Sequence, residues 1–190
     1  MLRLLGSSLV GTCILVCIAS VQAAIIYVPD NYSTIQQAVD AANAGDTIIV
    51  RDGVYVENIV INKSLTIKSE NGSVNCIIQS ANLDDHVFEV LADYVNIIGF
   101  TVKGGKSGVF LSSNNNFIAC NTINNNNGGI NLFKSNNSVI KNNTVHDNED
   151  FGIHLAHSCS NIIAGNVVIN DGYCDIYLII IILVTLLLII

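Results

Sequence analysis

The sequence predicts an all-β fold, a parallel β-helix in which the chain coils around one apolar core, with a short α-helix before the first turn of the coil. Three observations predict it: a repeat of about 22 residues, short apolar patches within each repeat, and 25 asparagines among 190 residues. A repeat of this length is typical of solenoids, whose successive turns stack to bury a shared core.

The repeat is clearest in four aligned segments, which start 21, 23 and 23 residues apart: Gly108–Leu111, Gly129–Leu132, Gly152–Leu155 and, more weakly, Asp175–Leu178. Apolar residues alternate within these segments, which is the pattern of a half-buried strand. Each repeat holds three such patches, so one repeat makes one turn of three strands. About four turns are recognisable, and neighbouring turns would lie about 4.8 Å apart. We expect Val109, Ile130 and Ile153 to point into the shared core.

Asparagine takes the polar positions that charged residues occupy in most proteins, because charged residues make up only 12% of the chain. Asn121, Asn143 and Asn166 recur at one offset, just before a strand of each turn. Asparagine tolerates the left-handed backbone conformation of a tight bend, and its amide both donates and accepts hydrogen bonds. We therefore predict a structural asparagine ladder that runs from turn to turn.

The segment before the repeats predicts a cap for the open end of the core. Ser33 to Gln36 form a capping box, apolar residues follow at helical spacing, and Gly45 ends the helix. Thr47–Val50 then begins a strand. The ends of a solenoid core need a cover. We therefore assign residues 24–178 to the β-helix domain and residues 24–50 to its N-terminal cap region.

Both ends of the chain carry apolar segments. Residues 1–23 have the features of a signal peptide, namely basic Arg3, an apolar run and the cleavage sequence Val21-Gln22-Ala23, so we expect an exported chain. Residues 176–190 contain no charge but are shorter than the roughly 20 residues of a membrane helix. Three interpretations of this tail remain open: a membrane anchor, a truncated span, or a strand that closes the coil.

The charge balance, 8 basic against 15 acidic residues, argues against a nucleic-acid partner. Cys76, Cys120, Cys159 and Cys174 lie outside the signal segment. Export permits disulfides, but none of these cysteines has CxxC spacing. Bridges and free thiols therefore both remain open.

Several segments resemble the opening of exported right-handed β-helix proteins: Ile26–Pro29, Thr34–Val39, Ala44–Val50, Gly53–Glu57 and Leu65–Ile67. With the Gly-Ile-x-Leu and Asn-x-Ile repeats, they are similar to the pectin-lyase-like group. Within that group they resemble the family of NosD-type periplasmic copper-binding and carbohydrate-binding, sugar-hydrolase-like repeats. The resemblance covers roughly residues 25–178. It implies a right-handed coil in the periplasm or at the cell surface, which binds or acts on polysaccharide or assists copper-enzyme maturation.

Residues for sugar cleavage are sparse in this chain. Such chemistry needs paired carboxylates at a defined separation, or a metal-bound carboxylate set with a base. Asp147, Glu149 and Asp150 share one loop and Asp171 lies in the next, which is typical of solvated surface. We therefore name no catalytic residue and expect a non-catalytic module. A polysaccharide lyase or hydrolase is the alternative.

Candidate copper ligands are His146, His154, His157 and Cys159. The repeat puts His146 and His154 on different sides of a turn, and His157 would face away from His154. We therefore name no metal ligands. Copper remains a cofactor that only the resemblance implies.

The best candidate for a binding site is an outward column of Phe110, Asn131, His154 and Tyr177, which take the same position in successive turns. Sugar rings stack on aromatic side chains and hydrogen-bond to amides, so we predict a carbohydrate ligand. Five Asn-x-Ser/Thr sequons, the acceptor motif for N-glycosylation, also occur, at Asn31, Asn62, Asn71, Asn136 and Asn142.

Overall fold

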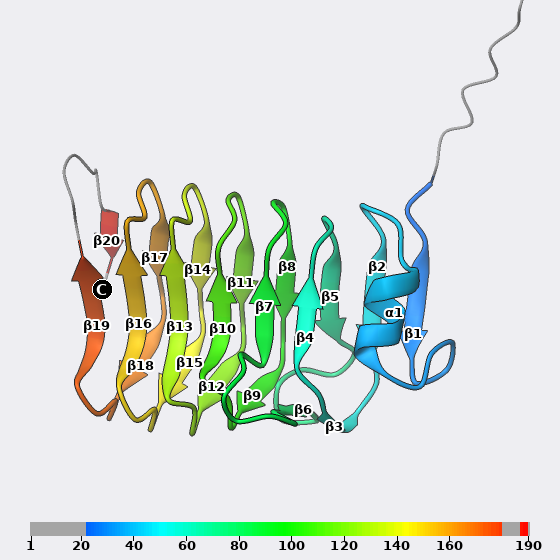
Figure 1. Cartoon of the computed structure of the whole chain (residues 1–190), viewed down its shortest axis with the longest axis horizontal. Helices are drawn as coiled ribbons and strands as arrows, with labels where there is room; N and C mark the ends of the chain where they lie inside the picture. The colour runs from blue at the N-terminus through cyan, green and yellow to red at the C-terminus, as the bar shows by residue number, and fades with distance from the viewer. Residues whose placement is uncertain (1–21, 180–186, 190) are drawn as a thin grey trace, which may run out of the picture.

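The computed structural model describes residues 22–179 and 187–189, and within them the chain forms a parallel β-helix with one short α-helix (Figure 1). Three parallel sheets run along the coil, and the chain visits them in the same order in every turn. The predicted fold class is therefore confirmed.

Each sheet collects one strand from every turn of the coil. The first sheet contains β1 (Ile25–Val28), β2 (Thr47–Val50), β5 (Thr66–Ser69), β8 (Asn96–Ile98), β11 (Phe117–Ala119), β14 (Val139–Lys141), β17 (Ile162–Ala164) and β20 (Leu187–Ile189). The second sheet contains β3 (Gly53–Val56), β6 (Cys76–Gln79), β9 (Thr101–Lys103), β12 (Thr122–Asn124), β15 (Thr144–His146) and β18 (Val167–Ile169). The third sheet contains β4 (Ile59–Ile61), β7 (Phe88–Val90), β10 (Ser107–Leu111), β13 (Gly128–Phe133), β16 (Phe151–Ala156) and β19 (Cys174–Ile179).

The described residues form six complete turns, from β2–β4 to β17–β19, which corrects our expectation of about four. The period of about 22 residues cannot be recognised in the early turns, because their corner segments differ in length. First-sheet strands start at Thr47, Thr66 and Asn96, which are 19 and then 30 residues apart. Uneven spacing of this kind hides the period that the later turns display.

The core consists mainly of aliphatic side chains that stack in columns from turn to turn, together with the fully buried Phe88 and Phe100. Val109, Ile130 and Ile153 are register partners in β10, β13 and β16, and each is fully buried, as predicted. Burying one such side chain stabilises the fold by roughly 1.5–3 kcal/mol. These shared columns are therefore the main source of stability.

Asparagine side chains link neighbouring turns at the corner between the first and second sheets. The backbone N–H and the side-chain amide of Asn121 both donate to Oδ1 of Asn143, at 3.0 and 3.1 Å. Asn143 donates in the same way to Asn166, at 2.9 and 3.0 Å. Each side chain thereby satisfies backbone and amide groups of the turn before it.

The bend itself is made by the residue before each ladder asparagine, which corrects our prediction. The backbone angle φ is positive at Cys120 (57°), Asn142 (55°) and Gly165 (63°), one position earlier than expected. The left-handed residue faces outward, whereas the ladder asparagine turns its amide into the corner. The other two corners carry equivalent ladders, formed by Asn116, Ser138 and Asn161, and by Asn126, Asn148 and Asp171.

The helix α1 (Ile35–Ala41) covers the N-terminal end of the core. Its ends differ from the predicted ones. Thr34, rather than Ser33, is the N-cap residue, and its Oγ1 accepts a hydrogen bond from the Gln37 N–H at 3.2 Å. The helix ends before Gly45, which instead makes a turn with a φ of 93°.

The expected signal segment, residues 1–23, lies outside the described residues except for its last two positions. In the apolar tail, residues 176–179 belong to β19, and β20 pairs with β17. These tail residues are strands of the coil, while residues 180–186 and 190 lie outside the described part, so the three interpretations of the tail stay open. No helix among the described residues is both long and apolar enough to cross a membrane.

Candidate functional site

The outward column lies on the outer face of the third sheet. Phe110, Asn131, His154 and Tyr177 are successive register partners in β10, β13, β16 and β19. The same register extends the column to Glu89 in β7. The structure thus places the four predicted residues side by side and adds a carboxylate at one end.

Aromatic rings pack against one another at both ends of this column. The Phe110 ring stacks on His86, with ring centroids 4.3 Å apart and planes 8° apart. Toward the other end, His154 stacks on Tyr177 at 5.2 Å, and Phe151 packs against His154 at 4.7 Å. Phe110 is half-buried and Tyr177 is 37% exposed, so both rings keep part of their surface open to solvent.

Four buried polar atoms of this face have no hydrogen-bond partner among the described residues. They are Nδ1 of His86, Oδ1 of Asn131 and both ring nitrogens of His154. Burial lowers the pKa of His86 and of His154, so both imidazoles are neutral at pH 7 and each has one donor and one acceptor nitrogen. An unpaired buried polar group costs about 1–3 kcal/mol. A ligand that pairs with these atoms would recover part of that cost.

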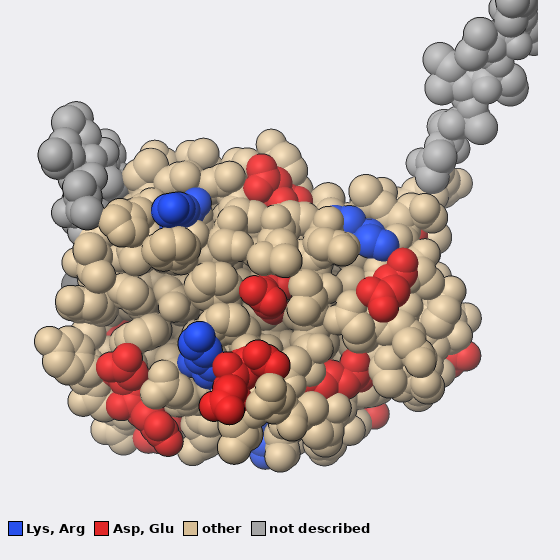
Figure 2. All heavy atoms as spheres, in the orientation of Figure 1, with Lys and Arg blue, Asp and Glu red and all other residues tan. Residues whose placement is uncertain are grey.

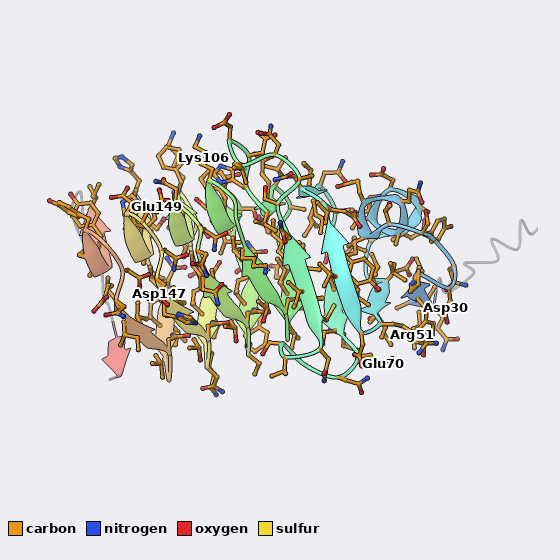
Figure 3. All side chains as sticks on the ribbon, turned by 90° about the horizontal axis from the view of Figure 1, so that it is seen from below. Asp30, Arg51, Glu70, Lys106, Asp147 and Glu149 are labelled. Carbon is orange, nitrogen blue, oxygen red and sulfur yellow. The ribbon has the colours of Figure 1, made fainter. Side chains whose placement is uncertain are left out.

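Two hollows lie beside the Phe110 end of the column. The smaller, about 350 Å³, is lined by His86, Glu89 and Lys106 among others. The larger, about 670 Å³, lies at the corner between the second and third sheets, and Lys106 and Glu149 are among its lining residues. Figure 3 shows Lys106 and Glu149 along the same edge of the coil. In Figure 2 the charged side chains are scattered, and most of the face seen there is uncharged.

The structure does not gather the acidic residues that the sequence grouped together. Oδ2 of Asp147 lies 2.6 Å from Nδ1 of His146, and this hydrogen bond lowers the pKa of Asp147. Glu149 lines the larger hollow, and Figure 3 shows it well apart from Asp147. Asp171 ends a corner ladder and accepts hydrogen bonds from Asn148. The loop therefore does not present these carboxylates as one group.

The copper ligands considered in the sequence do not converge. His146 lies in β15 of the second sheet, His154 lies in β16 of the third sheet, and His157 follows β16. Sγ of Cys159 lies 2.8 Å from Oδ1 of Asn136, and all four described cysteines are free thiols. Within the described ranges, no three His, Cys, Asp or Glu side chains form a group that could hold a metal ion. The described donor atoms therefore do not fit a copper site.

The stacked turns and the exposed face define a β-helix repeat protein. The chain belongs to the family described as periplasmic copper-binding protein (NosD), whose model matches residues 39–178. It is 36% identical, over 162 residues, to a cell surface glycoprotein of Methanothermus fervidus, and this alignment covers 65% of the chain and 26% of that protein. The chain thus spans about a quarter of the length of that relative. The predicted family resemblance is confirmed.

Two solved structures share the fold. The pectate lyase Pel9A superimposes with a TM-score of 0.65 at 18% identity, over 77% of this chain and 48% of that one. A rice weevil pectin methyl esterase gives a TM-score of 0.50 at 14% identity, over 77% of this chain and 66% of that one. At these identities the likeness shows the fold alone.

Three residues of this region are not predicted by the repeat: His86, Glu89 and Lys106. Glu89 takes the outward position of β7, which belongs to a turn that the repeat did not reveal. His86 and Lys106 lie in corner segments, and no repeat offset determines the path of such segments. Nothing in the sequence could therefore have placed His86 against Phe110.

Proposed function

We propose that this chain is an exported β-helix module that binds a carbohydrate chain along the outer face of its third sheet. One observation carries the proposal: in the column of Phe110, Asn131, His154 and Tyr177, aromatic rings flank polar atoms that have no partner among the described residues. The family description and the cell-surface relative support export.

The spacing and the chemistry of the column suit a row of sugar rings. Neighbouring strands lie about 4.8 Å apart, so a polymer lying across them would meet one side chain per turn. Phe110 and Tyr177 offer apolar ring surface to the C–H faces of sugars. Once these side chains rotate so that their buried polar atoms reach the surface, Asn131 Oδ1 would accept a hydrogen bond from a hydroxyl, and the neutral His154 would both donate and accept.

The ligand that we propose is an uncharged polysaccharide. The chain has a formal net charge of −7, and few charged side chains lie on the face shown in Figure 2. A polyanion would be repelled by the overall negative field. A neutral glycan would meet the aromatic and amide groups without that penalty.

A glycan array with the purified chain, followed by calorimetry on the glycan that binds best, tests this proposal. Phe110→Ala and Tyr177→Ala should each weaken binding by about 3- to 10-fold, since one aromatic contact contributes about 0.5–1.5 kcal/mol. Phe117→Ala is the matched control, because it removes the same side chain from the first sheet. Unchanged affinity in both column variants would refute this binding face.

The same preparations separate the two alternative functions. Release of reducing ends from a polysaccharide would indicate cleavage rather than binding alone. Stoichiometric uptake of Cu²⁺, reversed by a chelator, would indicate copper handling, which the family description favours.

A further inference from the structure

The five sequons differ in how the fold presents their asparagines. N-glycosylation joins the Nδ2 atom of the asparagine to C1 of a sugar from a lipid-linked sugar pyrophosphate. The bond between C1 and the phosphate oxygen breaks, the phosphate leaves with the electron pair, and the amide gives up one proton. We therefore take as requirements an exposed side-chain amide that no protein hydrogen bond holds in place and an accessible hydroxyl two residues later.

Asn136 fails each of these requirements. Its Nδ2 donates to Oδ1 of Asn114 at 3.0 Å, and its own Oδ1 accepts from the backbone N–H of Cys159 at 2.8 Å. The sequon hydroxyl belongs to Ser138, which is fully buried. A sugar at Asn136 would break a turn-to-turn contact and would need space inside the coil.

Asn142, six residues later, meets each requirement. It is the left-handed corner residue, with a φ of 55°, and its side chain is exposed. No hydrogen bond of its side-chain amide occurs among the described residues, and its sequon hydroxyl is on the exposed Thr144. The corner ladder uses the neighbouring Asn143 instead, so a sugar at Asn142 leaves the ladder intact.

Asn62 also presents a free amide. It directly follows β4, it is exposed, and its side chain makes no hydrogen bond within the described part of the chain. Its sequon hydroxyl, on the partly exposed Ser64, donates to the carbonyl of Tyr94 at 3.0 Å, so this site meets the requirements less fully than Asn142 does. Two other sequon side chains are exposed but are held by local hydrogen bonds: Oδ1 of Asn31 accepts from the backbone N–H of Tyr27 at 2.7 Å, and Nδ2 of Asn71 donates to the carboxylate of Asp52 at 3.1 Å.

We infer that Asn62 and Asn142 are N-glycosylation sites and that Asn136 is not. The inference rests on the export that we propose above. It also fits the proposed binding face, because Asn142 lies at the corner between the first and second sheets and Asn62 lies next to the first strand of the third sheet, so both leave the column between Phe110 and Tyr177 uncovered.

Glycopeptide mass spectrometry of the full chain, purified from the surface fraction of the cells that produce it, tests this inference. Peptides with Asn62 and Asn142 should carry a glycan mass, and the peptide with Asn136 should not. Thr144→Ala should remove one glycan mass without altering the corner asparagines, whereas Asn136→Gln should leave the glycan mass unchanged.

A glycan on Asn136, or a surface-exposed chain without glycan on Asn62 and Asn142, would overturn the inference while leaving export intact. Cell fractionation distinguishes the two proposals. A chain retained in the cytoplasm would overturn export and, with it, this assignment of sites.

Discussion

The two ends of the coil differ in how their core is closed. At the N-terminal end, α1 lies over the first turn, and Ile35 and Val39 of the helix are fully buried. At the C-terminal end, Ile176 takes the inward position beside Ile153 but is 37% exposed, because no described strand pairs with the far side of β19. In this fold, a core side chain is therefore buried by the turn that stacks on it. An end turn without such a cover contributes little to the stability of the fold.

Polar contacts follow the same division. Near the N-terminal end, Arg51 bonds both Asp30 and Glu70 at 2.6 Å, and its guanidinium lies 4.8 Å from the centre of the Tyr27 ring (Figure 3). The hydrogen bond from Arg51 lowers the pKa of Asp30. Toward the C-terminal end, Oδ2 of Asp171 is buried and has no hydrogen-bond partner among the described residues, and burial raises the pKa of Asp171. Ion pairs thus join neighbouring turns near the N-terminal end, whereas near the C-terminal end one oxygen of the Asp171 carboxyl lacks a described partner.

The largest expected effect is the difference in stability lost when the same core side chain is truncated in a middle turn and in the last turn. Ile130 and Ile176 occupy the same inward column, with Ile153 between them. Ile130→Ala should lower the free energy of unfolding by about 2–5 kcal/mol, because it opens a cavity among fully buried neighbours. Ile176→Ala should cost less than about 1 kcal/mol, because its site is already open to solvent. Urea unfolding measures both, and equal losses would contradict the comparison.

The next largest effect concerns the corner ladder. Asn143→Ala removes the acceptor of two Asn121 donors and the donor that reaches the Ile118 carbonyl, so we expect a loss of about 2–3 kcal/mol. Asn166→Ala, in a more exposed part of the ladder, should cost about 1 kcal/mol. Thermal unfolding of both variants provides the measurement. A smaller loss of stability for Asn143→Ala than for Asn166→Ala would show that burial does not determine how much a ladder asparagine stabilises the fold.

A smaller effect is expected at the cap. Thr34→Ala removes the acceptor of the Gln37 N–H and should cost about 1 kcal/mol. Amide hydrogen exchange should become faster in α1 and in β1 beneath it, and should stay unchanged in β19. If amide exchange became faster by the same factor in β1 and in β19, the helix would not act only on the end of the core that it covers.

The smallest effect is a pH dependence at Asp171. Burial favours its neutral form, and Asp175 raises the pKa further, while hydrogen bonds from Asn148 and the charge of His146 lower it. Because the folded pKa is raised, its stabilising contribution is present at acidic pH and is lost as the pH rises through the folded pKa. Asp171→Asn, which restores the ladder residue of this corner, should therefore stabilise the chain more at pH 7 than at pH 4. A stability gain that is independent of pH would contradict this account.

The sequence predicted those parts of the molecule in which successive turns repeat one another. Val109, Ile130 and Ile153 could be placed in one column because equal spacing in a parallel stack means equal position in space. The same argument placed Phe110 beside Asn131. Asn121 was correctly put at a corner, but its role as a backbone bend was wrong, because the amide that bonds the next turn must face inward while the bending residue faces outward.

The parts that the sequence could not predict lie where the turns differ from one another. The segment between β6 and β7 brings His86 against Phe110, and the segment before β10 brings Lys106 to two hollows. Each placement depends on the path of a single corner segment, which has no counterpart in other turns. The N-terminal end of α1 was missed by one residue, because Ser33 and Thr34 both make acceptable N-caps. Its C-terminal end was placed at Gly45, a few residues after the actual end at Ala41.

Amide hydrogen exchange of the unmodified chain tests the central claim most directly. Protection should be highest in β10 and β13, should remain high in β2 under the helix, and should fall through β18 and β19. Protection in β19 equal to that in β13, or weaker protection in β2 than in β19, would contradict a coil whose described residues cover the core at the N-terminal end and leave β19 uncovered.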